Sequence, residues 1–424
     1  MLLGGKMNLN LENFKYDAER CTRCKGCYWV DHIYMPGIQF SERCPSLTRY
    51  LLEAYSAFGR LRLAWALLEG RIDYSPTLLD VIYKCTLGGA CDAGCKRNLD
   101  LEPILTMEAL RARCVKDGAG PMPEHIEIAD SLAKSHNRFG SPETRTRWLP
   151  DNAGVSRKAD IIYFAGCATS YSDQKTGRAV VDILNSTGTE FSVMDEEWCC
   201  GYLLYTTGQI DKAREHMEHN IEAIKGYGAR TVLTNCAECY KTLKVDYPKL
   251  LGKSTADMGF NVLHLTEFLE ELLGSGGLKF KKEIPLKVTY HDPCNLGRLS
   301  EPWINWEGKR VQWGCLDPPK EFRRCTNGIY ESPRYLLREI PGVEFIDMPR
   351  HRENAWCCGS GGGVKAAFND FALWAAEKRI EEAESIGAEA IISCCPQCED
   401  NLREAVKDKK IKIYDMAEII QRAI

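Results

Sequence analysis

The stretch Trp356-Cys357-Cys358-Gly359 has a near copy earlier in the chain, Trp198-Cys199-Cys200-Gly201. Each copy has one cysteine upstream, Cys167 or Cys294, and a C-x2-C pair downstream. The spacings read C-x31-CC-x35-C-x2-C in the first copy and C-x62-CC-x36-C-x2-C in the second. Adjacent cysteines followed by glycine rarely occur by chance. A five-cysteine motif that occurs twice is the most specific pattern in this sequence, and it predicts two related domains.

The cysteine content indicates the chemical class. The chain has 424 residues and 21 cysteines, with 44% hydrophobic and 27% charged residues and a formal net charge of −4. Disulfide frameworks are typical of small secreted domains, and the N-terminus lacks the apolar stretch of a signal peptide. Thiolate ligands for metal or iron–sulfur clusters in a reducing cytoplasm fit better. The charge is not that of a nucleic-acid-binding protein, and no run of apolar residues is long enough to predict a membrane span.

The N-terminal residues 1–116 contain a second cysteine pattern, typical of two-cluster ferredoxins. Three cysteines form C-x2-C-x2-C, and a Cys-Pro pair follows later. In the bacterial ferredoxin run C-x2-C-x2-C-x3-C, the fourth cysteine binds the other cluster. Aligned in this way, one cluster takes Cys21, Cys24, Cys27 and Cys95, and the other takes Cys44, Cys85 and Cys91. We therefore expect an iron–sulfur domain that resembles a ferredoxin.

The second of these sets is one thiolate short, because Gly88 stands where its fourth cysteine is expected. Three cysteines allow a [3Fe-4S] cluster, a four-iron cluster with water or a non-cysteine ligand, or substitution by a nearby cysteine. Cys114 is the nearest unassigned cysteine in sequence, but its flanks predict a helix, and a free cysteine is more often simply buried. Zinc is the alternative metal for this domain. Since zinc prefers separate C-x2-C pairs, the triple run favours iron–sulfur clusters.

From residue 159 onward, predicted strands and helices alternate in two copies. In the first copy we expect strands at 161–164, 191–193, 231–234 and 261–264, and helices at 177–186, 210–226 and 266–273. In the second copy we expect strands at 288–290, 343–346, 390–393 and 411–414, and helices at 333–339, 368–386 and 416–423. Such alternation predicts parallel α/β units. Their ligands gather at the carboxyl ends of the strands, where these cysteines fall.

Composition divides the chain into four parts. Residues 1–116 are expected to form the ferredoxin-like domain, with a connecting helix over 51–70. Residues 117–158 are rich in Gly, Pro, Asn and Ser, and they predict a linker that wraps between domains. The two cysteine-rich domains are expected over 159–275 and 284–424. The predicted fold class is α+β multidomain, with a helical N-terminal domain and two pseudo-two-fold-related α/β domains.

Two further features have open interpretations. The second copy has about thirty extra residues, 301–330, which include Trp303, Trp306, Trp313, Cys315 and Cys325. A lid or docking surface and an inserted loop that packs its own aromatics both account for them, and neither cysteine receives a ligand role. His291, in His-Asp-Pro-Cys, can donate protons to a sulfur product. A structural histidine is the simpler interpretation.

These motifs resemble the D-type subunit of heterodisulfide reductase, in which a two-cluster ferredoxin domain is fused to two CCG domains. The resemblance covers nearly the whole chain from Cys21 onward. It implies that each five-cysteine motif binds a non-cubane [4Fe-4S] cluster, and that both clusters face one pocket in which a disulfide is split. The implied ligands are Cys167, Cys199, Cys200, Cys236 and Cys239 for one cluster and Cys294, Cys357, Cys358, Cys395 and Cys398 for the other, with Cys394 an extra neighbour.

The resemblance implies a cytoplasmic oxidoreductase subunit that passes electrons through cubane clusters to the paired non-cubane clusters, which reduce or form a disulfide. The implied partners are other redox subunits: a flavoprotein, a ferredoxin-like protein or a membrane cytochrome. The gap between Cys27 and Cys44 and the extra residues look more like bacterial relatives, such as the homologous subunit of benzoyl-CoA reductase complexes. Subunits of lactate or glycolate oxidation are also similar. The alternative function is therefore an electron relay without a substrate of its own.

Overall fold

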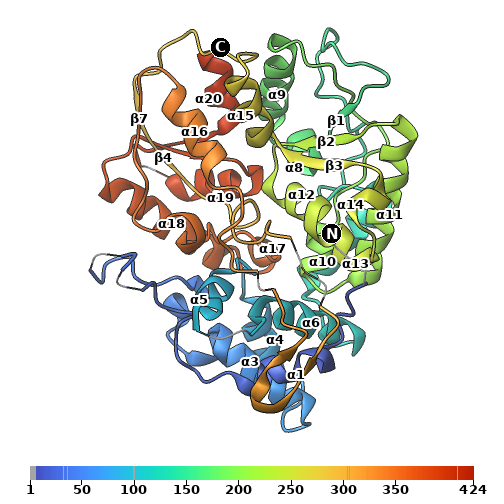
Figure 1. The fold of residues 1–424 in the computed structure, drawn as a ribbon, viewed down its shortest axis with the longest axis vertical. Helices are drawn as coiled ribbons and strands as arrows, with labels where there is room; N and C mark the ends of the chain where they lie inside the picture. Colours follow the sequence, from blue (N-terminus) through green and yellow to red (C-terminus); the bar gives the residue numbers. More distant parts are fainter. Residues whose placement is uncertain are drawn as a thin grey trace.

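A computed structural model describes residues 6–31, 33–35, 37–98, 101–302, 304, 306–321, 323–407 and 409–424. Trp303, named above, lies outside the described residues. Figure 1 shows the N-terminal helices at the bottom in blue. The first cysteine-rich half lies above them in green, and the second lies beside it in orange and red.

Short helices build the N-terminal part. They are η1 (Leu11–Phe14), α1 (Lys15–Arg20), α2 (Pro45–Tyr50), η2 (Glu53–Tyr55), α3 (Ala57–Leu68), α4 (Pro76–Tyr83), α5 (Ala90–Asn98) and α6 (Pro103–Lys116). Proline opens three of them, at a position where a backbone N–H would have no helical partner. The helix expected over 51–70 begins only at Ala57, because the Ser56 hydroxyl accepts from the Gly59 N–H (2.9 Å) and so caps the helix there.

The segment 117–158 contains a helix that its composition did not predict. This helix, α7 (Pro123–Ser135), begins with proline and is followed by its C-cap residue His136, which adopts a left-handed conformation. Further on, Trp148 is buried, with 1% of its surface exposed. The segment therefore packs into the core. Its prolines and glycines mark the ends of a helix rather than an extended linker.

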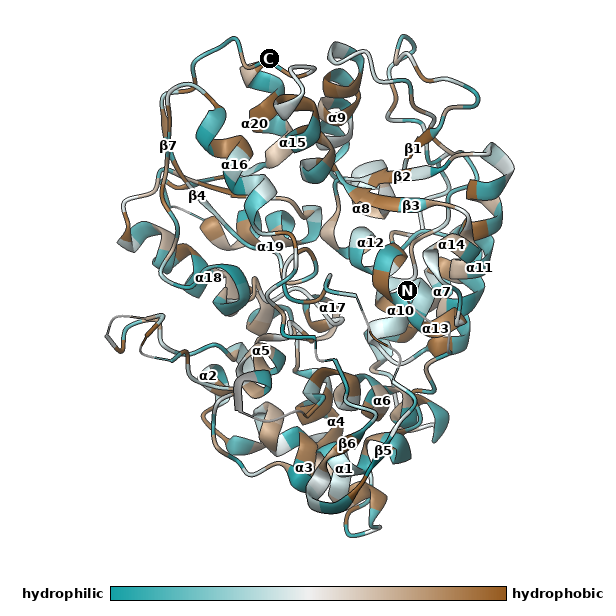
Figure 2. Cartoon of the chain, in the orientation of Figure 1, coloured by the Kyte–Doolittle hydropathy of each residue, from teal (hydrophilic) through white to brown (hydrophobic). Residues whose placement is uncertain are grey.

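The first cysteine-rich half is built on a parallel three-stranded sheet in the order β1-β2-β3. Its strands are β1 (Ile161–Tyr163), β2 (Thr231–Thr234) and β3 (Asn261–His264). Its helices are α8 (Gly166–Tyr171), α9 (Gln174–Ser186), α10 (Tyr202–Thr206), α11 (Ile210–Tyr227), α12 (Ala237–Lys241), α13 (Tyr247–Leu251), α14 (Thr255–Met258) and α15 (Leu265–Gly274), with η3 (Thr242–Asp246) between α12 and α13. The strand expected at 191–193 is reduced to one parallel bridge between Ser192 and Ile162, since turns lie on both sides of it. Figure 2 shows β2 and β3 as largely apolar, in keeping with their burial.

The second half repeats this plan with four parallel strands in the order β7-β4-β8-β9. Its strands are β4 (Leu286–Tyr290), β7 (Val343–Phe345), β8 (Ala390–Ser393) and β9 (Lys412–Asp415). Its helices are α16 (Glu331–Glu339), η5 (Arg352–Asn354), α17 (Val364–Ala367), α18 (Asn369–Ser385), α19 (Pro396–Val406) and α20 (Met416–Ala423). The order matches that of the first sheet, with the Ser192 bridge in the place of β7. The predicted α+β multidomain fold class is confirmed.

The two halves pack against each other through two pairs of helices, and each pair joins a helix of one half to the same non-equivalent helix of the other half. Helix α20 of the second half contacts α9 of the first, and α16 of the second contacts α15 of the first. These helices lie together in the upper part of Figure 1. Because α9 corresponds to α16 and α15 to α20 in the repeat, the two contacts are equivalent to each other. This reciprocity is the pattern of a two-fold interface.

The N-terminal helices meet both halves at Arg111 of α6, which is 1% exposed. Its guanidinium donates to the carbonyls of Thr206 and Gly362 (both 2.7 Å), one from each half. It also donates to three carbonyls of its own domain, those of Ile82, Tyr83 and Cys85. One side chain thus joins three parts of the molecule.

The extra residues of the second half lie along the N-terminal helices. Arg323 pairs with Asp92 (3.0 Å) and Lys320 with Glu102 (2.9 Å). The same stretch contains two short antiparallel strands, β5 (Lys309–Arg310) and β6 (Leu316–Asp317), joined through η4 (Gln312–Gly314). Trp306 donates its indole N–H to a carbonyl within the insertion, as the packed-loop interpretation predicts, whereas Trp313 is 90% exposed. The insertion therefore holds the second half against the N-terminal helices.

His125 of α7 lies at the same junction as Arg111. Its side chain is buried, and its Nε2 lies 2.9 Å from the Gly363 carbonyl oxygen. Its Nδ1 is buried and has no hydrogen-bond partner among the described residues. Burial lowers the pKa of His125 from its ordinary value of 6.5 to about 4. The ring is therefore neutral at physiological pH.

We expect this histidine to make stability depend on pH. In the unfolded chain His125 binds a proton once the pH falls below 6.5. In the folded protein it binds that proton only near pH 4, because burial lowers its pKa. The free energy of unfolding should therefore fall by roughly 2–3 kcal/mol as the pH drops through this window. Urea unfolding midpoints measured between pH 7 and 4.5 test this, with His125→Gln as the comparison. The variant should show a shallower pH dependence, and equal slopes would contradict the assignment.

Candidate metal centres

The upstream cysteine of the first motif follows the first strand of its sheet. The chain leaves β1 through Gly166, and Cys167 lies in the first turn of α8. Gly166 is left-handed (φ +74°), and a Cβ there would lie 2.9 Å from the Cys239 sulfur. Glycine is therefore required for this close approach between the two cysteine segments.

A buried ion pair holds this turn. The Glu197 carboxylate accepts from the N–H groups of Ala165 and Gly166 (3.0 Å each) and from the Arg145 guanidinium (2.9 Å). Arg145 in turn donates to the Cys167 sulfur at 3.6 Å. A positive charge beside this sulfur favours its thiolate form. Neither Arg145 nor Glu197 was predicted. Only the position of Glu197, directly before the first WCCG stretch, could have drawn attention to it.

Each CCG motif ends in glycine because the backbone there is left-handed. Gly201 has φ +90° and Gly359 has φ +99°. A Cβ on Gly359 would lie 2.5 Å from a carbonyl oxygen of α18. The preceding tryptophans are also packed: Trp198 stacks on two histidine rings, and Trp356 donates its indole N–H to the α18 backbone (2.9 Å). These contacts set the direction in which the two adjacent cysteines point.

The downstream C-x2-C pair follows a buried strand in each half and begins a helix. Cys236 is the N-cap residue of α12, and Cys395 is the N-cap residue of α19. Cys239 and Cys398 lie in the helices themselves. A helix N-terminus stabilises negative charge and so favours a thiolate, whereas the neighbouring thiols and burial raise the pKa of Cys239, Cys395 and Cys398. The cysteines thus lie at the carboxyl ends of the strands, where the sequence predicted them.

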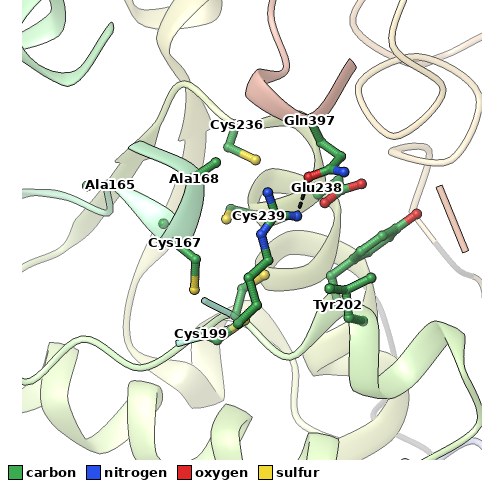
Figure 3. A pocket seen from close by; sticks show the side chains of 13 residues that line it. Ala165, Cys167, Ala168, Cys199, Tyr202, Cys236, Glu238, Cys239 and Gln397 are labelled. Atoms are coloured by element: carbon green, nitrogen blue, oxygen red, sulfur yellow. Dashed lines mark hydrogen bonds between the residues drawn. The ribbon is translucent and has the colours of Figure 1, made fainter. Parts of the chain in front are cut away.

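All five cysteines of the first motif line one cavity. Figure 3 shows the labelled Cys167, Cys236 and Cys239 around this space. Gln397, which belongs to the second half, also lines the cavity. The cavity therefore lies at the boundary between the two halves.

Polar side chains outside the motif form part of this wall. Glu238 stands inside the first C-x2-C pair, and Gln397 is its equivalent in the second. Arg138, which follows α7, donates to the Gln397 side-chain oxygen, and Figure 3 shows this bond. Burial raises the pKa of Glu238 to about 8, and the neighbouring Cys236 adds to the shift. Alignment of the two C-x2-C pairs could have found Glu238 and Gln397, whereas nothing in the sequence indicates Arg138.

The five cysteines of the second motif are also in contact. The sulfurs of Cys358 and Cys398 are 3.2 Å apart. Cys357 also interacts with Cys294 and Cys358, and Cys398 interacts with Cys395. All five are buried. The structure therefore brings together the complete set that the repeat predicted.

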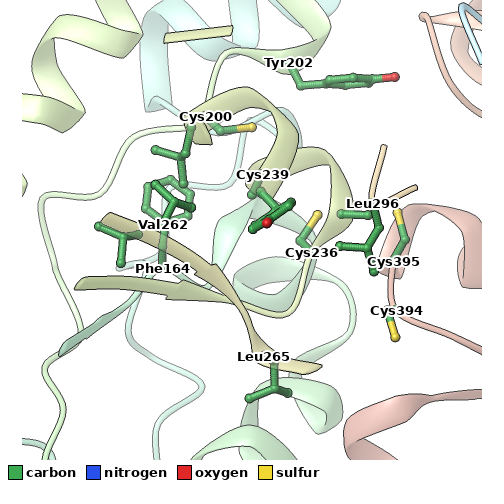
Figure 4. Close-up of a cluster of buried hydrophobic side chains, with 14 of the residues drawn as sticks. Phe164, Cys200, Tyr202, Cys236, Cys239, Val262, Leu265, Leu296, Cys394 and Cys395 are labelled. Carbon is green, nitrogen blue, oxygen red and sulfur yellow. The ribbon is translucent and has the colours of Figure 1, made fainter. Parts of the chain in front are cut away.

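The two motifs meet at Cys236 and Cys395, whose thiols interact with each other across the boundary between the halves. Across the same boundary the Ala237 N–H donates to the Cys394 carbonyl (3.2 Å). Figure 4 shows Cys236 and Cys395 on neighbouring segments of the two halves, while the Cys394 sulfur points in the direction opposite to that of Cys395. Each cysteine of the two motifs thus interacts with another cysteine of the motifs, and these interactions form one series that begins at Cys167 in the first motif and ends at Cys294 in the second.

His291 lies beside the second motif and is 1% exposed. Its Nδ1 accepts a hydrogen bond from the Arg379 Nε–H (3.1 Å), so the ring proton is on Nε2. Burial, together with the Arg379 charge, lowers the pKa of His291 to about 3. A ring nitrogen and the sulfurs of Cys358 and Cys398 lie within 4.8 Å of one another. The ring is therefore neutral and close to these sulfurs, its Nε2 has no hydrogen-bond partner among the described residues, and its role in catalysis stays a prediction.

The N-terminal cysteines form two groups. Cys21 and Cys95 lie in one apolar cluster, with Cys27 packed against it, while Cys24 is exposed. A separate cavity is lined by Cys44, Cys85, Cys91 and Gly88. The groups overlap, because Cys44 also packs against the cluster of Cys21 and Cys95, and Cys27 also packs against the cluster of Cys357 with Cys85 and Cys91. The ligand assignment from the ferredoxin alignment therefore stays a prediction.

Cys114, Cys315 and Cys325 are absent from the described linings of both the cavity of the first motif and the cavity beside Gly88. Cys114 is buried in α6, as expected from its helical flanks. Cys325 is buried in the insertion, and Cys315 is exposed there. The sequence assigned none of them a ligand role.

Comparison with known proteins agrees with this geometry. The family model of the CCG cysteine-rich domain matches residues 161–244 and 288–403. The chain is 33% identical to the D-type subunit of the dihydromethanophenazine:CoB–CoM heterodisulfide reductase of Methanosarcina mazei, over 96% of this chain and 94% of that protein. The chain belongs to the family of heterodisulfide reductase D-type subunits. The resemblance inferred from the cysteine motifs is thus confirmed, and the family is one of iron–sulfur oxidoreductase subunits.

Other similar proteins share less of their length with this chain. The B-type subunit of the fumarate reductase (CoM/CoB) of Methanothermobacter marburgensis is 30% identical, over 81% of this chain and 61% of that protein. The EtfAB:quinone oxidoreductase of Syntrophomonas wolfei is 27% identical, over 84% of this chain and 48% of that protein. Among the described residues, no helix is long and apolar enough to cross a membrane.

Proposed function

We propose that the protein is an iron–sulfur oxidoreductase subunit that reduces or forms a disulfide at the boundary between its two cysteine-rich halves. The observation that carries this proposal is the meeting of the two five-cysteine motifs at Cys236 and Cys395. A disulfide takes up two electrons and two protons to become two thiols. Two one-electron centres beside one pocket match that demand, whereas a single centre does not.

The residues present suit iron–sulfur clusters better than zinc. Five cysteines around one cavity exceed the four ligands of a structural zinc site. Arg145 and the N-termini of α12 and α19 place positive charge beside the sulfurs, which suits anionic clusters. The first motif would hold one cluster and the second motif the other, with the ligand sets given above. When bound, the clusters supply electron storage and transfer.

The N-terminal cysteines provide an entry for electrons in this proposal. Cys24 is exposed, so a cluster there is accessible to a redox partner. Cys27 packs against both the apolar cluster of Cys21 and that of Cys357, and so lies between the surface and the second half. Other redox subunits are the expected partners, as in the multi-subunit enzymes to which the chain is similar.

Anaerobic purification followed by iron and acid-labile sulfide analysis is the first test. The reduced protein is then mixed with the CoM–CoB heterodisulfide or with 2-hydroxyethyl disulfide, and reoxidation is followed by absorbance and EPR. We expect one disulfide to remove two electrons per protein and to release two thiols. A protein with stoichiometric zinc and no sulfide would contradict the proposal.

An electron relay without its own substrate is the competing function, favoured by the similarity to EtfAB:quinone oxidoreductase. A relay would be reoxidised by a small redox protein but by neither disulfide. The same mixing experiment therefore separates the two functions.

A further inference from the structure

We infer that Cys357 completes the ligand set of the second ferredoxin-type cluster, in the place that Gly88 leaves open. The inference rests on the proposed function, since it presupposes iron–sulfur clusters in the N-terminal domain. It assigns Cys357 a contact outside its own CCG motif.

The cavity beside Gly88 is lined by cysteines from two parts of the chain. Cys44, Cys85 and Cys91 come from the N-terminal helices, and Cys357 comes from the second half. A Cβ on Gly88 would lie 3.3 Å from the Cys357 sulfur. That sulfur thus lies in contact with the position from which a side chain at residue 88 would begin. The cavity therefore has four thiols, the usual ligand set of a [4Fe-4S] cluster.

A buried arginine clamps the two segments together. The Arg298 Nε–H donates to the Gly88 carbonyl (2.8 Å), and its Nη1 donates to the Ala355 carbonyl (2.6 Å), just before Cys357. The next residue, Gly89, is left-handed, and a Cβ there would lie 2.6 Å from the Leu299 side chain. The approach of Gly88 to Cys357 is thus held by hydrogen bonds and by a position that requires glycine.

The charge around the cavity suits an anionic occupant. Arg43, Arg60 and Arg298 line it, and all three are buried. The Nη2 of Arg298 is buried and has no hydrogen-bond partner among the described residues. A buried cation is normally paired with an anion. A cluster bound by thiolates carries negative charge and would be the anionic partner of the Arg298 guanidinium.

Thr86 is the competing ligand. Its hydroxyl also lies 3.3 Å from the position of a Cβ on Gly88. Cys114, the substitute considered from sequence, does not line this cavity. Because Cys357 also contacts Cys294 and Cys358, its thiolate would bind both clusters. A thiolate sulfur has more than one lone pair and can bridge two iron atoms. Such a bridge would connect the N-terminal domain directly to the second CCG centre.

The test compares anaerobically reconstituted variants by EPR and iron analysis. Wild-type protein should contain no three-iron cluster. Cys357→Ala should convert the second ferredoxin-type cluster to the three-iron form, with an EPR signal of the oxidised protein that is stoichiometric with the chain. Cys358→Ala is the matched control, since it removes the adjacent cysteine of the same motif, which does not line this cavity. Damage to the second CCG centre should change the spectra of both variants alike, so a three-iron signal confined to Cys357→Ala reports the ferredoxin-type cluster. A three-iron signal of equal size in both variants would overturn the inference.

A second substitution completes the experiment. Gly88→Cys introduced into Cys357→Ala should restore the four-iron form. The other ferredoxin-type cluster reports correct folding in every variant. A three-iron cluster in the wild-type protein, or an unchanged four-iron cluster in Cys357→Ala, would overturn the inference, as would a three-iron signal in Thr86→Val alone. A wild-type protein without iron and sulfide would instead overturn the proposed function.

Discussion

Replacement of Cys395 by alanine is expected to abolish disulfide turnover, whereas the same replacement of Cys394 should leave it close to the wild-type rate. The two residues are adjacent, and each is 1% exposed, so both variants lose the same buried atoms. Of the two, only the Cys395 thiol interacts with the thiols of Cys236 and Cys398. The Cys394 sulfur lies near Tyr290 and points the other way (Figure 4).

The size of the effect follows from the role proposed for Cys395. Loss of a group that merely supports a metal ligand lowers affinity or activity by about 10- to 100-fold, so loss of a ligand should slow turnover by at least ~100-fold. Stopped-flow reoxidation of the reduced protein by 2-hydroxyethyl disulfide measures the rate, and iron analysis measures cluster content. Equal losses in both variants would indicate a packing defect and contradict the ligand role.

Arg111→Met is expected to have the largest effect on stability. The substitution keeps much of the side-chain length but removes the donors to Thr206 and Gly362, one carbonyl from each half. A buried carbonyl without a partner costs about 1–3 kcal/mol, and several carbonyls are affected. The contacts between the N-terminal domain and both halves should weaken together.

The matched control is Arg113→Met, two residues along the same helix. Arg113 is partly exposed and pairs with Asp117 and Glu12. Such surface pairs contribute up to about 1 kcal/mol. Scanning calorimetry should show a midpoint lower by about 5–10 °C for Arg111→Met and by at most ~2 °C for Arg113→Met. Similar shifts for the two variants would show that Arg111 does not join the domains.

Most of the strands and long helices that were expected in the two halves are found, because each has a local pattern, whereas α19 (Pro396–Val406) and the short helices were not predicted. The buried strands β2 and β8 are short apolar runs, and the long helices α11 and α18 begin and end within a few residues of the expected positions. Predictions were wrong where a single side chain sets a boundary. The Ser56 cap delays α3, and α7 lies within a segment that composition indicated to be a linker.

The sequence by itself determined the family, the repeat, and the placement of cysteines at strand ends and helix starts. Motif spacing and periodicity are local properties, so they can be recognised without coordinates. Only the tertiary structure decided which cysteines meet. The contact of Cys236 with Cys395 depends on the reciprocal packing of the two halves. The approach of Cys357 to Gly88 depends on the Arg298 clamp. Such contacts join residues far apart in the chain, and no local pattern encodes them.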